Sequence, residues 1–105
     1  MIVNPLPTAR LMVSGLLQPD GAPEAREARR GMVVLDATGG PAGTLAGVVI
    51  DGATDRPAAL VLSRDTATGD YRLVAVGQVA GVDTAAVRLR LTAAEVATLP
   101  NHSPD

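Results

Sequence analysis

The most regular pattern of apolar and polar positions lies near the end of the chain. Residues 85–91 contain a run in which apolar residues alternate with arginines: Val87, Arg88, Leu89, Arg90 and Leu91. A period of two places successive side chains on opposite faces of an extended chain. This run therefore predicts a strand with one buried face and one face in water.

Upstream of that strand, short apolar runs are separated by clusters of turn residues. We expect strands at residues 32–35, 44–50, 58–63 and 71–76, with residues 78–82 as a short continuation of the last. The segments between them, such as residues 38–41 (TGGP), predict tight turns because Gly adopts positive φ and Pro presets its own φ. Gly47, inside a predicted strand, indicates a bulge or a tight bend.

A short helix is predicted after the last strand. Thr92 and Glu95 have the spacing of a capping box, in which each side chain satisfies a free backbone N–H of the other residue. The helix should extend to about Leu99, with Val96 and Leu99 as its buried pair one turn apart. The tail at residues 101–105 is expected to be disordered.

The first thirty residues are less regular. Residues 10–17 (RLMVSGLL) are short and apolar, and we expect them to add one strand. Residues 18–30 combine prolines with charged residues and predict a polar loop. A helix over residues 23–30 is the alternative, because proline is tolerated at a first helical position. We therefore treat residues 1–30 as an N-terminal extension of a domain at residues 31–100.

These elements predict a mainly β fold. Five to six short strands at this spacing, followed by a short C-terminal helix, are typical of a small antiparallel β-barrel. Closure into a barrel would remove the exposed edges of an open sheet.

Composition indicates a weakly stabilised core. The chain has 105 residues, enough for one domain, and 47% of them are hydrophobic. Tyr71 is the only aromatic residue, so Val, Leu, Ile, Met and Ala must build the core. Burying a large apolar side chain contributes about 1.5–3 kcal/mol, and Ala far less. We therefore expect a marginally stable monomer or a homo-oligomer, most simply a dimer.

Charge and residue usage narrow the classes of function. The formal net charge is −2, and all nine basic residues are Arg, so the strong basic surface of a nucleic-acid-binding protein is not expected. The absence of Cys excludes disulfides and thiolate metal sites. No run approaches the ~20 apolar residues of a membrane span, and the N-terminus lacks the pattern of a secretory signal. We expect a cytoplasmic protein.

Residues 34–62 carry a recurring arrangement of apolar residues, glycines and turn aspartates. Its members are Val34, Asp36, Gly39, Gly43, Leu45, Val48, Ile50, Asp51, Thr54, Asp55 and residues 60–62 (LVL). This arrangement resembles the opening hairpin of a PRC-barrel domain, and residues 74–89 are similar to the second half of that domain. The resemblance covers roughly residues 31–100. Ala75 stands where the family often has a proline.

The resemblance implies a six-stranded barrel that serves as a docking module. Members of the family include the cytoplasmic domain of the photosynthetic reaction centre H subunit and the C-terminal domain of a ribosome-maturation factor. The first is tethered by a membrane helix and the second follows another domain, so this chain resembles a stand-alone member. We expect a non-catalytic adaptor that binds another protein or itself. The alternatives are an RNA-processing or ribosome-associated binding protein and a small enzyme or metal-binding protein.

Candidate reactive groups are few. His102, the only histidine, lies in the polar tail, where no rigid scaffold would hold it. Asp36, Asp51 and Asp55 would suit Ca²⁺ if they converged, but their spacing lacks the density of known calcium loops. Aspartates in turns more often accept hydrogen bonds from nearby backbone amides. We therefore expect them to be structural.

The glycines near the first hairpin lead to the same interpretation. A phosphate-binding glycine loop opens a helix and is followed by Lys, whereas here a strand follows and the chain has no Lys. The expected structural set, in turns and bends, is Gly31, Asp36, Gly39, Gly43, Gly47, Asp51 and Asp55. We expect no catalytic residue, no metal ligand and no cofactor.

Overall fold

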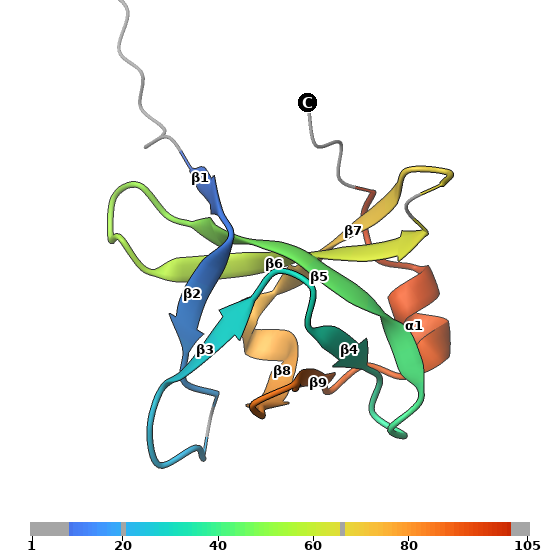
Figure 1. Cartoon of the computed structure of the whole chain (residues 1–105), viewed down its shortest axis with the longest axis horizontal. Helices are drawn as coiled ribbons and strands as arrows, with labels where there is room; N and C mark the ends of the chain where they lie inside the picture. The colour runs from blue at the N-terminus through green and yellow to red at the C-terminus, as the bar shows by residue number, and fades with distance from the viewer. Residues whose placement is uncertain (1–8, 20, 66, 102–105) are drawn as a thin grey trace, which may run out of the picture.

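The structure is a computed structural model that describes residues 9–19, 21–65 and 67–101. It is mainly β, with one short α-helix and one 3-10 turn (Figure 1). The elements are β1 (Arg10–Met12), β2 (Ser14–Leu17), β3 (Arg26–Arg29), β4 (Val33–Leu35), β5 (Pro41–Ile50), β6 (Pro57–Asp65), β7 (Asp70–Ala75), η1 (Val76–Gln78), β8 (Val79–Val82), β9 (Ala86–Leu89) and α1 (Ala93–Ala97).

Most of the strands form one sheet in the order β7-β6-β5-β4-β9-β8, and β1 also pairs with β5. The strands β2 and β3 form a separate two-stranded sheet. The order of the large sheet ends at β7 on one side and at β8 on the other. Within the described part of the chain, no pairing joins these two ends.

One pairing differs from the antiparallel arrangement that the sequence predicts, because β4 and β9 are parallel. The strands β5, β6 and β7 reverse direction at each connection, as in a meander. The connection from β7 to β8 is the 3-10 turn η1, which carries the chain onward instead of reversing it. The antiparallel pair β8–β9 then leaves β9 running in the same direction as β4.

The C-terminal helix begins as predicted. The hydroxyl of Thr92 accepts a hydrogen bond from the backbone N of Glu95 at 3.2 Å, and the carboxylate of Glu95 accepts one from the backbone N of Thr92 at 3.0 Å. Both halves of the capping box are therefore present. Val96 is buried, whereas Leu99 is only partly buried.

The N-terminal segment corrects the expectation for residues 18–30. Neither a loop throughout nor a helix at residues 23–30 forms, because Arg26–Arg29 is strand β3, paired with β2. The reason is tertiary packing. Ala28 and Leu17 are fully buried, and the hairpin lays them against the core. A side chain at Gly15 would approach Cγ1 of Val48 to 2.8 Å, so this contact requires glycine.

Candidate functional site

Asp36 is the most enclosed of the predicted turn aspartates. It is buried, and its Oδ1 accepts hydrogen bonds from the backbone N of Thr38 at 2.9 Å, the Thr38 hydroxyl at 2.6 Å and the backbone N of Gly40 at 3.0 Å. The hydrogen bonds from Thr38 hold the pKa of Asp36 below its usual value of 3.8, with smaller contributions from Gly40 and Gly39. This carboxylate organises the turn between β4 and β5.

Asp51 and Asp55 organise a different turn, between β5 and β6. Oδ1 of Asp51 accepts a hydrogen bond from the backbone N of Ala53 at 2.7 Å. Asp55 has a positive φ of 58°, and its side chain forms an ion pair with Arg10 of β1. The structure therefore places these two aspartates away from the turn of Asp36. Across the described residues, no cluster of three metal-binding side chains occurs.

The predicted glycines take several roles. Gly31, Gly39 and Gly43 have positive φ of 93°, 89° and 149°. Gly43 also lies so close to β6 that a Cβ would overlap the carbonyl oxygen of Ser63. Gly47 lies beneath Leu11, whose Cδ1 would be 2.6 Å from an added Cβ. His102, the remaining candidate, lies outside the described residues.

The first candidate surface is a run of exposed apolar residues on β1, on β2 and between them, which we name the strip: Leu11, Met12, Val13 and Leu16. These side chains are 44–64% exposed, although each is large and apolar. Leu11 and Met12 belong to the short strand β1, which pairs with the end of β5 and whose three residues are all exposed. Leu16 lies on β2 and is exposed opposite Glu27 of β3. Sequence reasoning treated this run as an ordinary strand and missed the exposed strip.

The strip adjoins a hollow of about 320 Å³ at Leu16. Its lining residues are Leu16, Leu17, Gln18, Ala25, Arg56, Pro57 and Val76. The hollow therefore lies between the β2–β3 hairpin on one side and the start of β6 and η1 on the other. Apolar side chains beside a concave surface are a common feature of protein contact sites.

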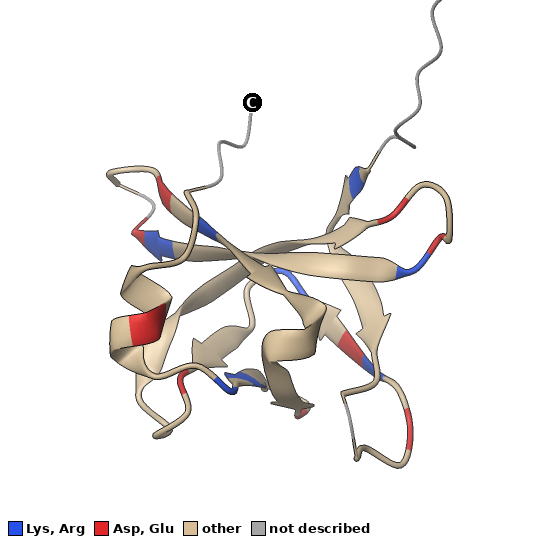
Figure 2. Cartoon of the chain, turned by 180° about the vertical axis from the view of Figure 1, so that it is seen from behind, with Lys and Arg blue, Asp and Glu red and all other residues tan. Residues whose placement is uncertain are grey.

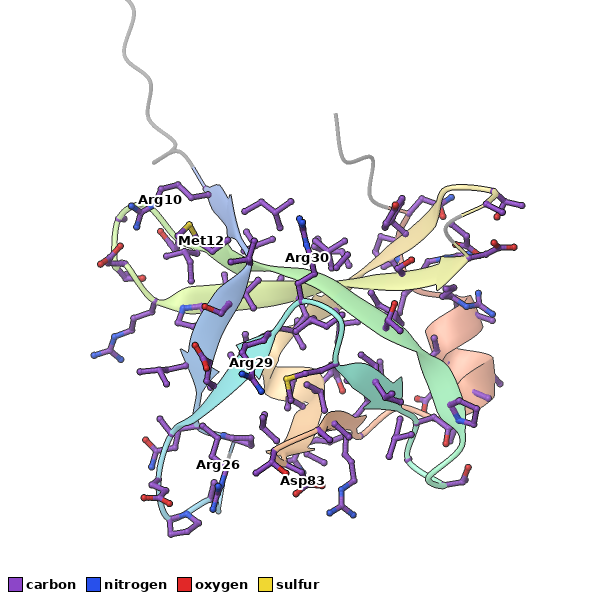
Figure 3. The ribbon with its side chains drawn as sticks, viewed as in Figure 1. Arg10, Met12, Arg26, Arg29, Arg30 and Asp83 are labelled. Atoms are coloured by element: carbon purple, nitrogen blue, oxygen red, sulfur yellow. The ribbon has the colours of Figure 1, made fainter. Side chains whose placement is uncertain are left out.

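The second candidate surface is a groove between β3 and the β8–β9 turn, which we name the seam. It contains two adjoining hollows of about 340 and 170 Å³ that share Glu24, Arg26 and Asp83. Figure 3 shows Arg26 on the hairpin and Asp83 on the opposite side of this gap. The remaining lining residues of the larger hollow are Ala25, Glu27, Arg29 and Thr84.

Around both surfaces, positively charged side chains lie close to negatively charged ones. Arg10 pairs with Asp55 beside the strip, while Arg26 pairs with Glu24 at 3.5 Å and Arg29 with Glu27 at 3.7 Å along the seam. Figure 2 shows acidic and basic positions interspersed around the molecule. Neither surface therefore has the one-sided charge that would select a polyanion.

Comparison with known protein families and curated proteins identifies no match. No protein-family model matches the chain, and no curated protein matches it. Among the described residues, no helix has the length and apolar character needed to cross a membrane.

Proposed function

We propose that this chain is a non-catalytic protein-binding module that associates with a second copy of itself through the apolar strip. The observation that carries the proposal is the exposure of Leu11, Met12, Val13 and Leu16 within six consecutive residues. Burying apolar surface contributes about 25 cal/mol per Å², so covering these side chains is a favourable contribution to association. The core holds no aromatic side chain that would add to the stability of the monomer.

A second copy fits the strip better than a strongly charged partner. The nearby charged residues form the pairs Arg10–Asp55 and Glu27–Arg29, which leave little net charge of either sign. In a two-fold interface the same surface meets itself, so a balanced surface can place each acidic group near a basic group of the other copy. A partner with excess charge of one sign would gain nothing there.

The proposal includes a barrel of the PRC type. The hairpin β2–β3 packs against β5 and approaches β8, which supports an arrangement in which it covers the open side of the large sheet. In such a barrel, the β1 end of the hairpin would be joined to the large sheet by the pairing of β1 with β5. The barrel would remain open at the seam, between β3 and β8. The turn aspartates support a non-catalytic role, because the carboxylates of Asp36 and Asp51 accept hydrogen bonds from their own turns.

The test is the mass of the protein in solution, by size-exclusion chromatography with light scattering. The chain has a mass of 10.6 kDa, and we expect wild type to elute with twice that mass. Leu16→Glu places a charge at the most exposed position of the strip and should yield a monomer. Because Leu16 is 64% exposed, this substitution should leave the fold intact.

The matched control is Val33→Glu, an exposed apolar position on β4 outside the strip. We expect this variant to remain dimeric. A monomeric wild type at the highest soluble concentration, or equal loss of the dimer in both variants, would contradict the proposal.

A further inference from the structure

Leu16, the most exposed residue of the strip, has an acidic neighbour on β3. Its partner in the register of the hairpin is Glu27. The backbone N of Arg30 donates to the carbonyl of Val13 at 2.7 Å, so these two residues form a hydrogen-bonded pair. Bonded and non-bonded pairs alternate along an antiparallel ladder, which makes Leu16 and Glu27 a non-bonded pair. Side chains lie closest together in such pairs, so Glu27 is directly beside Leu16 on the exposed face of the hairpin.

The other side of Leu16 carries a positive charge. There the strip adjoins the hollow of about 320 Å³, which Arg56 and Pro57 line at the start of β6. Arg56 is exposed and forms no ion pair with any residue that the structure describes. The neighbouring carboxylate of Asp55 is instead paired with Arg10. The hollow includes Leu16 but not Glu27, so β2 lies between the two charges.

Glu27 can accept a further ion pair. Its contact with Arg29 is long, at 3.7 Å, and both side chains are more than half exposed, so this contact is weak. Arg29 lies opposite Ser14, toward one end of β2, whereas Arg56 shares the hollow with Gln18, toward the other end. Two arginines can therefore approach the carboxylate of Glu27 from different directions.

We infer that the second copy binds with a two-fold axis that runs parallel to β2 near Leu16, so that Arg56 of each copy pairs with Glu27 of the other. This inference rests on the proposed self-association and adds the contacts that orient it. Rotation about such an axis exchanges the two sides of β2, which brings the positive side of one copy onto the negative side of the other. An axis that ran across β2 would leave each side facing itself, and like charges would meet.

The first test is the dissociation constant of the dimer, measured by sedimentation equilibrium. Arg56→Glu and Glu27→Arg each replace both attractive pairs of the interface by like-charge contacts, and each should raise the dissociation constant about tenfold. The double variant restores opposite charges and should return the constant to within about threefold of wild type.

The matched control for these variants is Arg90→Glu, which changes the net charge as Arg56→Glu does. Arg90 is exposed after β9 and lines none of the three hollows. This substitution should leave the dissociation constant unchanged.

The second test is cross-linking, which reports the direction of the axis because the chain has no native cysteine. Ser14 lies on the same face of β2 as Leu16, two residues away. With the axis along β2, the thiols of Ser14→Cys in the two copies lie close together, and a short bismaleimide should link them. With the axis across β2 at Leu16, the two sites would be about 13 Å apart along the strands and should not link. Arg90→Cys is the control and should not link in either arrangement.

The inference is overturned if the single charge variants behave like Arg90→Glu, if the double variant dissociates as readily as the single variants, or if Ser14→Cys does not link. In each of these cases, a dimeric wild type that Leu16→Glu converts to a monomer would leave the proposed function standing. A monomeric wild type would remove both proposals.

Discussion

Arg72 and Leu99 tie the C-terminal segment to the sheet. The guanidinium of Arg72, on β7, donates from Nη1 to the carbonyl of Leu99 at 2.7 Å and to that of Ala97 at 3.2 Å. Its Nε donates to the carboxylate of Asp70 at 2.8 Å. The Arg72 side chain is 18% exposed, so these contacts are largely shielded from water. One side chain thus satisfies carbonyls at the end of α1 and neutralises a carboxylate.

Removing this guanidinium should loosen the C-terminal segment. We expect Arg72→Met to lower the free energy of unfolding by about 1.5–3 kcal/mol, because the charge-assisted hydrogen bonds to Asp70 and the backbone carbonyls are lost, and Asp70 keeps only the longer contact with Arg64 at 3.8 Å. Urea denaturation measures this change. Hydrogen exchange should show the amides of α1 losing protection before those of β5 and β6.

The control for this prediction is Arg88→Met. Arg88 also pairs with an aspartate, Asp83, at 3.2 Å, but both side chains are more than half exposed. An exposed ion pair contributes about 0–1 kcal/mol. A loss at position 88 as large as that at position 72 would contradict the role assigned to Arg72.

Asp36 should make the stability of the fold depend on acidic pH. Hydrogen bonds in the folded state hold its pKa below 3.8, so the unfolded state binds a proton more readily. The stabilisation from Asp36 is therefore fully present above about pH 4 and is lost as the pH falls through the folded pKa. We expect Asp36→Asn to be less stable than wild type at neutral pH, with a smaller further loss on acidification.

Urea denaturation of both proteins at about pH 7 and about pH 3 measures this difference. The two unfolding free energies should converge at the lower pH. Parallel pH dependence in wild type and Asp36→Asn would show that Asp36 does not contribute to the acid sensitivity.

Local signals in the sequence predicted the elements whose structure is decided locally. The alternation from Val87 to Leu91 predicted β9, and the Thr92–Glu95 spacing predicted the start of α1. Both patterns act over a few residues, through side-chain alternation and capping. The strands from β4 to β7 were predicted from short apolar runs between turn residues, and their observed boundaries lie within three residues of the predicted ones.

Features that depend on distant neighbours were not predictable in this way. The residues of β3 read REAR, which has no strand signal of its own, and only the burial of Ala28 against the core makes this segment a strand. The parallel pairing of β4 with β9 depends on the non-reversing turn η1. The strip and the seam likewise depend on the tertiary arrangement of the strands, and no local sequence pattern predicts this arrangement.

Gly43 should tolerate substitution less well than Gly39, although both have positive φ. A Cβ at Gly43 would overlap the Ser63 carbonyl oxygen and approach Leu62 Cδ1 to 3.0 Å, while none of the atoms around Gly39 lies within 4 Å of such a Cβ. We expect Gly39→Ala to cost about 1–2 kcal/mol, from backbone strain alone. Gly43→Ala should cost clearly more, because β5 must also move away from β6. Thermal unfolding of both variants measures the order, and equal losses would contradict it.

Ser63 should be replaceable without loss of stability. Its hydroxyl is the one buried side-chain polar atom, among the described residues, that has no hydrogen-bond partner. Burying an unsatisfied polar group costs about 1–3 kcal/mol, so Ser63→Ala should leave stability unchanged or raise it by up to about 1 kcal/mol.

The contrast to Ser63→Ala is Thr38→Val, which removes a hydroxyl that donates to the Asp36 carboxylate at 2.6 Å and should lower stability by about 1.5–3 kcal/mol. Urea denaturation of the two variants compares a buried hydroxyl without a partner with one that has a charged acceptor. A marked loss of stability in Ser63→Ala would mean that its hydroxyl does have a partner in solution, such as a bound water.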